Sequence, residues 1–172
     1  MESISIISYQ PEHQPYFEKF NRNWIEKDFG MEPTDEYVLT RPAEAIIETG
    51  GAILMATYNG QIAGTVALRK IDESTYEFTK MAVDETYRRK GIAAALSNAS
   101  FEKAREMGAS TLILFSNSLL KPAITLYEKL GFKHVPVTTI GQYKRADVKM
   151  EISVSRNSKS CQAELAKAGN DQ

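Results

Sequence analysis

Residues 81–136 read MAVDETYRRKGIAAALSNASFEKAREMGASTLILFSNSLLKPAITLYEKLGFKHVP, and this stretch decides the fold. A strand ends near Val83, and the basic turn Arg88-Arg89-Lys90-Gly91-Ile92-Ala93 opens an alanine-rich helix. The first backbone N–H groups of a helix have no intrahelical partner, so they bind anions with the help of the helix dipole. Gly91 allows a phosphate to approach the backbone closely, and the three cations add positive field. The turn therefore predicts a pyrophosphate site, although such a run also occurs as a solvated bend.

Other phosphate-binding motifs do not fit the chain. Neither the P-loop pattern G-x-x-x-x-G-K-[ST] nor the dinucleotide pattern G-x-G-x-x-G occurs. A turn with a single glycine suits one pyrophosphate, as in coenzyme A, better than a triphosphate with Mg²⁺. The sequence therefore argues against a kinase or a nucleotidase.

Composition limits the remaining possibilities. The chain has 172 residues, 42% of them hydrophobic, which predicts one globular domain over residues 1–154 with a polar, flexible tail over 155–172. The net charge of −1 makes a nucleic-acid partner unexpected. We also expect no membrane segment, no metal site and a cytoplasmic location, because no long apolar run occurs and the single cysteine, Cys161, has no partner for a disulfide.

Apolar periodicity and turn residues predict an ordered series of elements. The turn Asn59-Gly60 is the strongest short hairpin signal, and a proline at position 42 is expected to break a helical region. The predicted strands are 3–9, 51–58, 61–71, 75–83, 110–115, 132–137 and 147–154, and the predicted helices are 11–29, 34–48 (interrupted near Arg41-Pro42), 91–107 and 118–130.

Two motifs resemble the GNAT superfamily of acyl-CoA N-acyltransferases. Arg88, Gly91 and Ala93 fit its pattern [RQ]-x-x-G-x-[GA], and residues 123–132, AITLYEKLGF, fit its second signature. The resemblance extends over roughly residues 1–154. It implies an α/β (α+β) fold with a central mixed, mostly antiparallel sheet of about seven strands, helices on both faces, and a pair of strands that splay apart to admit the pantetheine arm of acetyl-CoA.

The resemblance also implies which residues bind acetyl-CoA. Many members of the family carry N-x-x-A in the approach to the tyrosine that corresponds to Tyr127. Here Leu120 occupies the asparagine position, and the nearest amide is Asn117. Asn117 is expected either to reach the pantetheine or to belong to a helix-capping Ser-Asn-Ser run. The implied cofactor-binding residues are Met81, Ala82, Val83, Arg88, Arg89, Lys90, Gly91, Ile92, Ala93, Ala94 and Asn117.

Two residues are predicted to take part in chemistry. An aliphatic amine has a pKa near 10.4, so only roughly one molecule in 10³ is the neutral nucleophile at pH 7. Glu77 resembles in spacing the base of some GNAT enzymes, but it also fits an exposed charge on a strand, with water as the base. Tyr127 shares a helix face with Ala123 and Leu130. The resemblance gives it the role of acid for the departing thiolate, whereas the alternative is a core tyrosine bonded to a backbone carbonyl.

The predicted function is acetyl transfer from acetyl-CoA to the primary amine of a small molecule, by direct attack in a ternary complex. A protein lysine or N-terminus as acceptor, and a non-catalytic acyl-CoA-binding module, are the alternatives. The acceptor side is expected at Trp24–Arg41 and Thr138–Ala146. The expected partners are acetyl-CoA and an amine, and the protein is expected to be a monomer or a homodimer.

Overall fold

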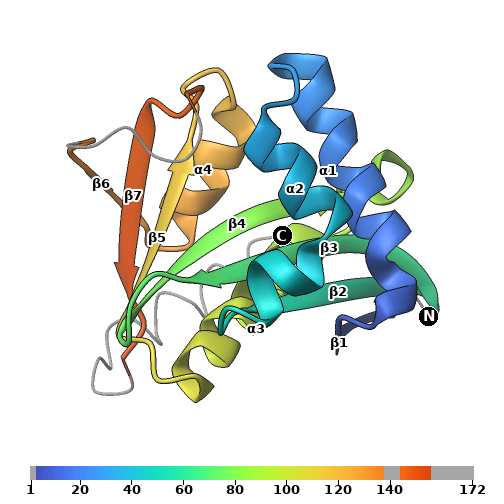
Figure 1. The fold of residues 1–172 in the computed structure, drawn as a ribbon, viewed down its shortest axis with the longest axis horizontal. Helices are drawn as coiled ribbons and strands as arrows, with labels where there is room; N and C mark the ends of the chain where they lie inside the picture. The colour runs from blue at the N-terminus through green and yellow to red at the C-terminus, as the bar shows by residue number, and fades with distance from the viewer. Residues whose placement is uncertain (1–2, 138–143, 156–172) are drawn as a thin grey trace.

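A seven-stranded sheet organises the computed structural model, which describes residues 3–137 and 144–155 (Figure 1). Its strand order is β1-β2-β3-β4-β5-β7-β6, and every neighbouring pair is antiparallel except β4 and β5. The mixed, mostly antiparallel sheet predicted from the sequence is confirmed. The strands are β1 (Ile4–Ser8), β2 (Ala52–Tyr58), β3 (Gln61–Lys70), β4 (Thr75–Val83), β5 (Thr111–Ser116), β6 (Lys133–Val135) and β7 (Val148–Ser153).

Helices cover both faces of this sheet. They are α1 (Gln14–Asp28), α2 (Pro33–Thr40), α3 (Ile92–Glu106) and α4 (Lys121–Lys129), with short turns η1 (Pro11–His13), η2 (Ala43–Ile47) and η3 (Glu85–Tyr87). One core joins α1, α2 and η2 to the sheet through side chains such as Phe17, Leu39 and Met55. A larger core contains Leu96 and Phe101 of α3 on the other face. Within residues 3–137 and 144–155, no helix is long and apolar enough to cross a membrane.

Local turn chemistry explains several boundaries. Asn59 and Gly60 have φ angles of 49° and 84°, the left-handed pair that a two-residue hairpin requires. Helix α2 ends at Thr40, two residues before Pro42, as expected. The last helix, however, begins at Lys121 rather than at residue 118. The preceding residues form a turn, in which the Leu119 N–H donates to Oδ1 of Asn117 at 2.9 Å.

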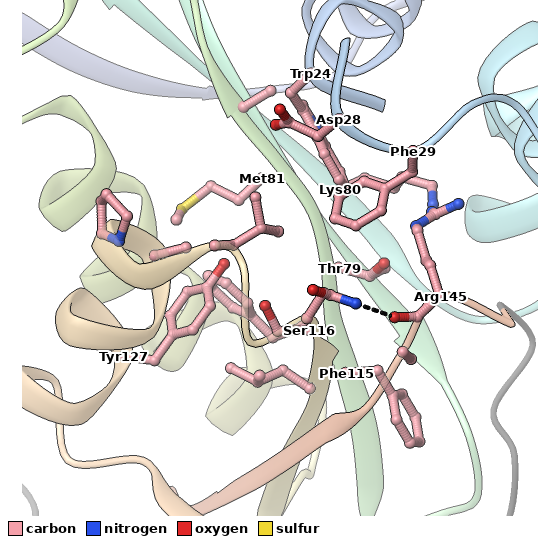
Figure 2. Close-up of a pocket in the computed structure, with 18 of the residues that line it drawn as sticks. Trp24, Asp28, Phe29, Thr79, Lys80, Met81, Phe115, Ser116, Tyr127 and Arg145 are labelled. Atoms are coloured by element: carbon pink, nitrogen blue, oxygen red, sulfur yellow. Dashed lines mark hydrogen bonds between the residues drawn. The ribbon is translucent and has the colours of Figure 1, made fainter. Parts of the chain in front are cut away.

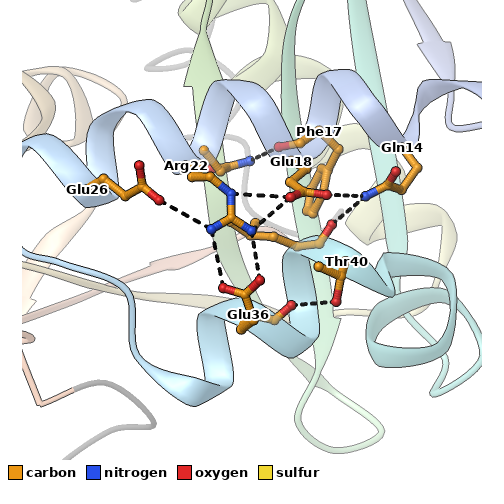
Figure 3. A network of polar contacts seen from close by, with 9 residues as sticks. Gln14, Phe17, Glu18, Arg22, Glu26, Glu36 and Thr40 are labelled. Atoms are coloured by element: carbon orange, nitrogen blue, oxygen red, sulfur yellow. Dashed lines mark hydrogen bonds and ion pairs between the residues drawn. The ribbon is translucent and has the colours of Figure 1, made fainter.

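Helices α1 and α2 are joined by a polar network around Arg22 (Figure 3). Its guanidinium contacts Glu18 at 2.8 Å and Glu26 at 3.3 Å on α1, and Glu36 at 3.0 Å on α2. The hydrogen bond with Glu36 is the largest of the causes that raise the pKa of Arg22. Exposed ion pairs contribute little to stability. The network instead fixes the angle between two helices whose connecting loop borders the functional site.

Strands β4 and β5 separate along their length. They pair in parallel only from Thr75 to Glu77 on β4 and from Thr111 to Ile113 on β5, although β4 continues to Val83. Beyond Glu77, the edge of β4 that faces β5 therefore has no ladder partner on that strand. The predicted splay of these two strands is confirmed.

A bulge in β4 lies at the point where the strands separate. Two β4 residues, Lys80 and Met81, stand opposite Val66 alone on β3. Lys80 has a φ of +56°, an uncommon conformation for a residue with a long side chain. Bulges of this kind turn a side chain to the opposite face of a sheet and are frequent beside active sites.

The faces occupied by neighbouring residues show this effect. Before the bulge, Tyr76 and Phe78 point into the core on the α3 side, whereas after it Met81 and Val83 do so. The alternation of side chains has shifted by one residue. In a regular strand, Lys80 would follow Phe78 toward α3. The bulge instead directs it toward α2.

Candidate active site

A cavity of about 510 Å³ occupies the space between the separated strands (Figure 2). Strands β4 and β5 form its floor, α4 lies on one side, and the end of α1 with the following loop lies on the other. Its walls include Trp24, Asp28, Phe29, Glu77, Thr79, Lys80, Met81, Ala82, Val83, Arg88, Phe115, Ser116, Asn117, Pro122, Ala123, Tyr127, Arg145 and Ala146.

Many of the predicted site residues meet at this cavity. Seven of them line it. They are the predicted catalytic residues Tyr127 and Glu77, the β4 residues Met81, Ala82 and Val83, the first arginine of the basic turn, Arg88, and the amide Asn117. The remaining six predicted cofactor-binding residues do not line it: Arg89, Lys90, Gly91, Ile92, Ala93 and Ala94. They form the turn into α3 and its first residues.

The turn before α3 has a backbone conformation that is compatible with the predicted anion site. Gly91 is the N-cap of the helix and has a φ of +82°, and Arg89 has a φ of +63°. Ile92 and Ala94 are buried, so their side chains belong to the core and only their backbone groups would be available to a ligand. Lys90 lies over the ring of Tyr58 at 5.8 Å. The N–H groups of the first helical turn have no intrahelical acceptor, which is the property on which the prediction rested.

Tyr127 presents its hydroxyl to the cavity. Its ring packs at 5.8 Å from Phe78 and 5.9 Å from Phe132, and Figure 2 shows the hydroxyl pointing toward the Met81 side of the cavity. Among the described residues, no group forms a hydrogen bond with this hydroxyl, so the alternative of a core tyrosine bonded to a backbone carbonyl does not describe it. Burial raises the pKa of Tyr127 to about 12. The group remains a proton donor throughout the neutral range.

Glu77 is buried, contrary to the alternative of an exposed strand charge. Its Oε1 accepts hydrogen bonds from Nε of Arg69 at 3.0 Å and from Nη2 at 2.8 Å. Arg69 is its direct cross-strand neighbour on β3. The ion pair holds one carboxylate oxygen in place, and the residue lines the cavity. Its role as a base stays a prediction.

Asn117 has a positioning role that the sequence did not indicate. Its Nδ2 donates to the backbone carbonyl of Arg145 at 2.6 Å. The neighbouring Ser118 is bonded to the Asp147 carboxylate through its N–H at 2.8 Å and its hydroxyl at 2.7 Å. These bonds tie the start of β7 to the end of β5. Because Leu120 is the N-cap of α4, the interpretation of Ser-Asn-Ser as a helix cap is wrong.

Three residues that the sequence did not single out form an ionic cluster beside the cavity. Asp35 is fully buried; its Oδ1 accepts from Nζ of Lys80 at 3.2 Å and from Nη2 of Arg145 at 2.8 Å, and its Oδ2 accepts from Nη1 of Arg145 at 2.7 Å. Arg145 also contacts Glu32 at 3.1 Å. The cluster joins the first turn of α2, the β4 bulge and the segment before β7.

The pKa values in the cluster reflect its burial. Burial is the largest influence on Lys80 and lowers its pKa to about 8, although the Asp35 charge acts in the opposite direction. Burial alone would raise the pKa of Asp35, but hydrogen bonds from Arg145 and from the Glu32 N–H, together with the two positive charges, lower it. Asp35 is therefore ionised at neutral pH.

A signal for one member of this cluster was present in the sequence. A lysine within the otherwise apolar end of a central strand is unusual, because lysine is rarely buried without a partner. Its partner was not visible, because Asp35 is 45 residues away in the chain. The predicted acceptor regions are represented by Trp24, Phe29 and Arg145, while residues 138–143, Cys161 and the predicted tail after residue 155 lie outside the described residues.

Comparison with known proteins agrees with this architecture. The chain is 35% identical over 108 residues to N-acetylaspartate synthetase from Xenopus tropicalis, an alignment that spans 62% of this chain and 37% of the relative. An acetyltransferase of the GNAT family from Staphylococcus aureus has a similar fold, with a TM-score of 0.79 and 19% identity over 89% of this chain and 100% of that one. The PaiA N-acetyltransferase of Thermoplasma acidophilum, solved with coenzyme A, gives a TM-score of 0.70 at 18% identity over 88% and 99% of the two chains.

The chain spans little more than a third of the length of the N-acetylaspartate synthetase it matches. The two solved structures show a shared fold. The model of the acetyltransferase (GNAT) family matches residues 13–132, which is more than half of the chain and includes both sequence motifs, the separated strands and Tyr127. The chain therefore belongs to the GNAT acetyltransferase family.

Proposed function

We propose that this protein transfers the acetyl group of acetyl-CoA to the primary amine of a small molecule, by direct attack in a ternary complex. The observation that carries the proposal is the hydroxyl of Tyr127 inside a cavity formed where β4 and β5 part. Family membership supports the same reaction.

The donor side of the site suits acetyl-CoA. Because β4 pairs with β5 only as far as Glu77, backbone groups between residues 78 and 83 are available to the amides of an extended pantetheine arm. Met81, Ala82 and Val83 are the proposed contacts. The N–H groups that follow Gly91 would receive the pyrophosphate, with Arg88 adding charge. The coenzyme A in the Thermoplasma neighbour supports this assignment.

The chemistry needs a neutral amine and a leaving sulfur that is stabilised. The amine nitrogen attacks the thioester carbonyl carbon, the C–N bond forms, and the C–S bond then breaks to release the thiolate. Tyr127 donates a hydrogen bond to that sulfur, because its raised pKa keeps the hydroxyl protonated. Glu77, held by Arg69, is the proposed acceptor of the amine proton, directly or through water.

A small acceptor is favoured by the walls of the cavity. Phe20, Trp24 and Phe29 of α1 and its following loop cover one end, and Arg145 borders the same end. The relatives named N-acetylaspartate synthetase are named for an acetylated amino acid, which supports a small acceptor. The cytoplasmic location and the monomeric or homodimeric state remain predictions, and light scattering after size-exclusion chromatography tests the latter.

An amine panel tests the proposal. Acetyl-CoA is incubated with small amines, amino acids and lysine-containing peptides, and released coenzyme A is detected with a thiol reagent. We expect release that depends on the concentration of a small amine. Turnover of peptides alone would replace the proposal with a protein acetyltransferase. Acetyl-CoA binding without turnover of any acceptor would indicate a non-catalytic module.

A further inference from the structure

Glu77 stands at the point where β4 and β5 separate. It is the last residue of β4 that has partners on both neighbouring strands, Arg69 on β3 and Ile113 on β5. Its backbone is therefore held on both sides, whereas the β4 residues that follow have no ladder partner on β5. A side chain that lines the cavity from this position is attached to rigid backbone, which places a functional group more precisely than a loop does.

Arg69 engages only one oxygen of the Glu77 carboxylate. The two residues lie directly opposite each other on antiparallel strands, so their side chains share one face of the sheet. Both Nε and Nη2 of the guanidinium donate to Oε1, at 3.0 and 2.8 Å. An arginine fork frequently spans both oxygens of a carboxylate, with one hydrogen bond to each. Here both hydrogen bonds converge on Oε1, and Oε2 receives none from Arg69.

The second oxygen, Oε2, is open to the cavity. Among residues 3–137 and 144–155, no group donates a hydrogen bond to it. The side-chain atoms that are fully buried without a partner include Oδ1 of Asn98 but not Oε2 of Glu77. The Glu77 side chain is 4% exposed and lines the cavity, so the cavity is the space that Oε2 reaches. An ionised carboxylate oxygen in that position can accept a proton.

The other carboxylate that lines the cavity is held differently. Asp28 is the last residue of α1, and it is exposed. No residue in the described part of the chain forms an ion pair or a hydrogen bond with its side chain. Catalysis benefits from a group that is fixed in its working geometry before the substrate arrives. Glu77 has that property, and Asp28 does not.

Stability alone does not explain the buried ion pair of Arg69 and Glu77. Removing a carboxylate from water costs free energy, and apolar residues of similar volume are often at least as stable as a buried pair. A buried carboxylate without a cation also tends to take up a proton, and it can then accept no other. A cation that occupies one oxygen favours the ionised form and keeps the second oxygen available.

We propose that Arg69 is a positioning residue for acetyl transfer, which holds Glu77 by Oε1 so that Oε2 accepts the proton of the acceptor amine. As the neutral amine attacks the thioester carbonyl carbon and the C–N bond forms, one proton passes from the nitrogen to Oε2, directly or through water. The C–S bond breaks, and its electron pair leaves on the sulfur. The proton then returns from Oε2 to solvent.

Arg69 acts only through Glu77 in this scheme, because it does not itself line the cavity. The inference rests on the acetyl-transfer function proposed above. It adds the atom that takes the proton and the residue that orients this atom.

A double-mutant cycle tests the coupling of the two residues. Values of kcat and KM for the amine that turns over fastest, and the calorimetric Kd of acetyl-CoA, are measured for the wild type, Arg69→Met, Glu77→Gln and the double variant. We expect kcat to fall about 10²-fold in Glu77→Gln and about tenfold or more in Arg69→Met, with the Kd of acetyl-CoA nearly unchanged. In the Glu77→Gln background, Arg69→Met should lower kcat no further. Losses that multiply would show that Arg69 serves only the fold, and would overturn the proposal.

Lys70→Met is the matched control. Lys70 follows Arg69 on β3 and pairs with Glu73, and its side chain is 29% exposed against 25% for Arg69. It does not line the cavity, and successive strand residues point to opposite faces, so its substitution should leave kcat unchanged. Melting temperatures check that each variant folds. If Arg69→Met does not fold, the cycle is run with Arg69→Lys, which keeps the charge but lacks the planar fork; its smaller loss should likewise vanish in the Glu77→Gln background.

The outcomes separate this inference from the acetyl-transfer function. Turnover that falls in neither Glu77→Gln nor Arg69→Met would leave the acetyltransferase standing and remove both the base and its positioning residue. A fall in Glu77→Gln alone would keep the base and overturn the role of Arg69. No turnover of any amine by the wild type would overturn the acetyl-transfer function and this inference with it.

Discussion

Replacing Tyr127 by Phe removes one hydroxyl and leaves the ring contacts intact. The ring packs against Phe78 and Phe132 at 5.8 and 5.9 Å, and these contacts persist in the variant. No described residue forms a hydrogen bond with the hydroxyl, so its removal leaves no buried partner unsatisfied. The cost of about 1–3 kcal/mol that an orphaned partner would impose is therefore not expected. The melting temperature should remain within a few degrees of the wild type.

The catalytic effect follows from the pKa. With Tyr127 near 12 and a thiol near 8.5, full proton transfer to the free thiolate is about 3.5 units uphill, roughly 5 kcal/mol at 1.36 kcal/mol per unit. The proposed role of Tyr127 is therefore a hydrogen bond to the sulfur as the C–S bond breaks, rather than full proton transfer beforehand. Loss of that bond should lower kcat by about 10²-fold, with the Kd of acetyl-CoA nearly unchanged.

The assay combines three measurements on each protein: kcat from coenzyme A release, the calorimetric Kd of acetyl-CoA, and the melting temperature. Tyr37→Phe, at an exposed position of α2, is the matched control. Because Tyr127 stays protonated up to about pH 11, wild type and variant should share the same alkaline limb in kcat. A marked fall in melting temperature with kcat preserved would refute the reasoning and make Tyr127 a core residue.

Three further predictions concern the cofactor turn, the base and the ionic cluster. Gly91→Val should weaken the calorimetric Kd of acetyl-CoA more than Arg88→Ala does, because valine is strained at a φ of +82° and blocks the backbone amides; equal losses would show that the arginine charge dominates. Glu77→Gln should lower kcat/KM and alter its acidic limb, and an unchanged profile would remove Glu77 as the base. The folded pKa of Asp35 is lowered, so its contribution to stability is complete above the unfolded pKa of about 3.9 and is lost as pH falls below it. Urea unfolding of Asp35→Asn should accordingly show a weaker loss of stability below pH 4 than the wild type, and parallel curves would contradict this.

The sequence by itself determined the order of elements and predicted the residues proposed here for the donor half of the site. Asn59-Gly60, Pro42 and the basic turn before Ile92 act through the backbone conformations of their own few residues, so their effects are readable without tertiary contacts. Tyr127 was placed on the inward face of its helix by helical periodicity, and it lines the cavity. The boundary of that helix was three residues off, because side-chain bonds to Asp147 hold its approach in a turn.

Only the tertiary structure decided the ionic cluster beside the cavity. The direction of Lys80 depends on a bulge, which exists only in the register between β3 and β4 and inverts the face that simple alternation would assign. Asp35 and Arg145 are 110 residues apart in the chain, and their hydrogen bonds help to keep the buried Asp35 carboxylate ionised. Pairing register and long-range ion pairs are properties of the assembled fold, because they arise from segments that have no local preference for one another.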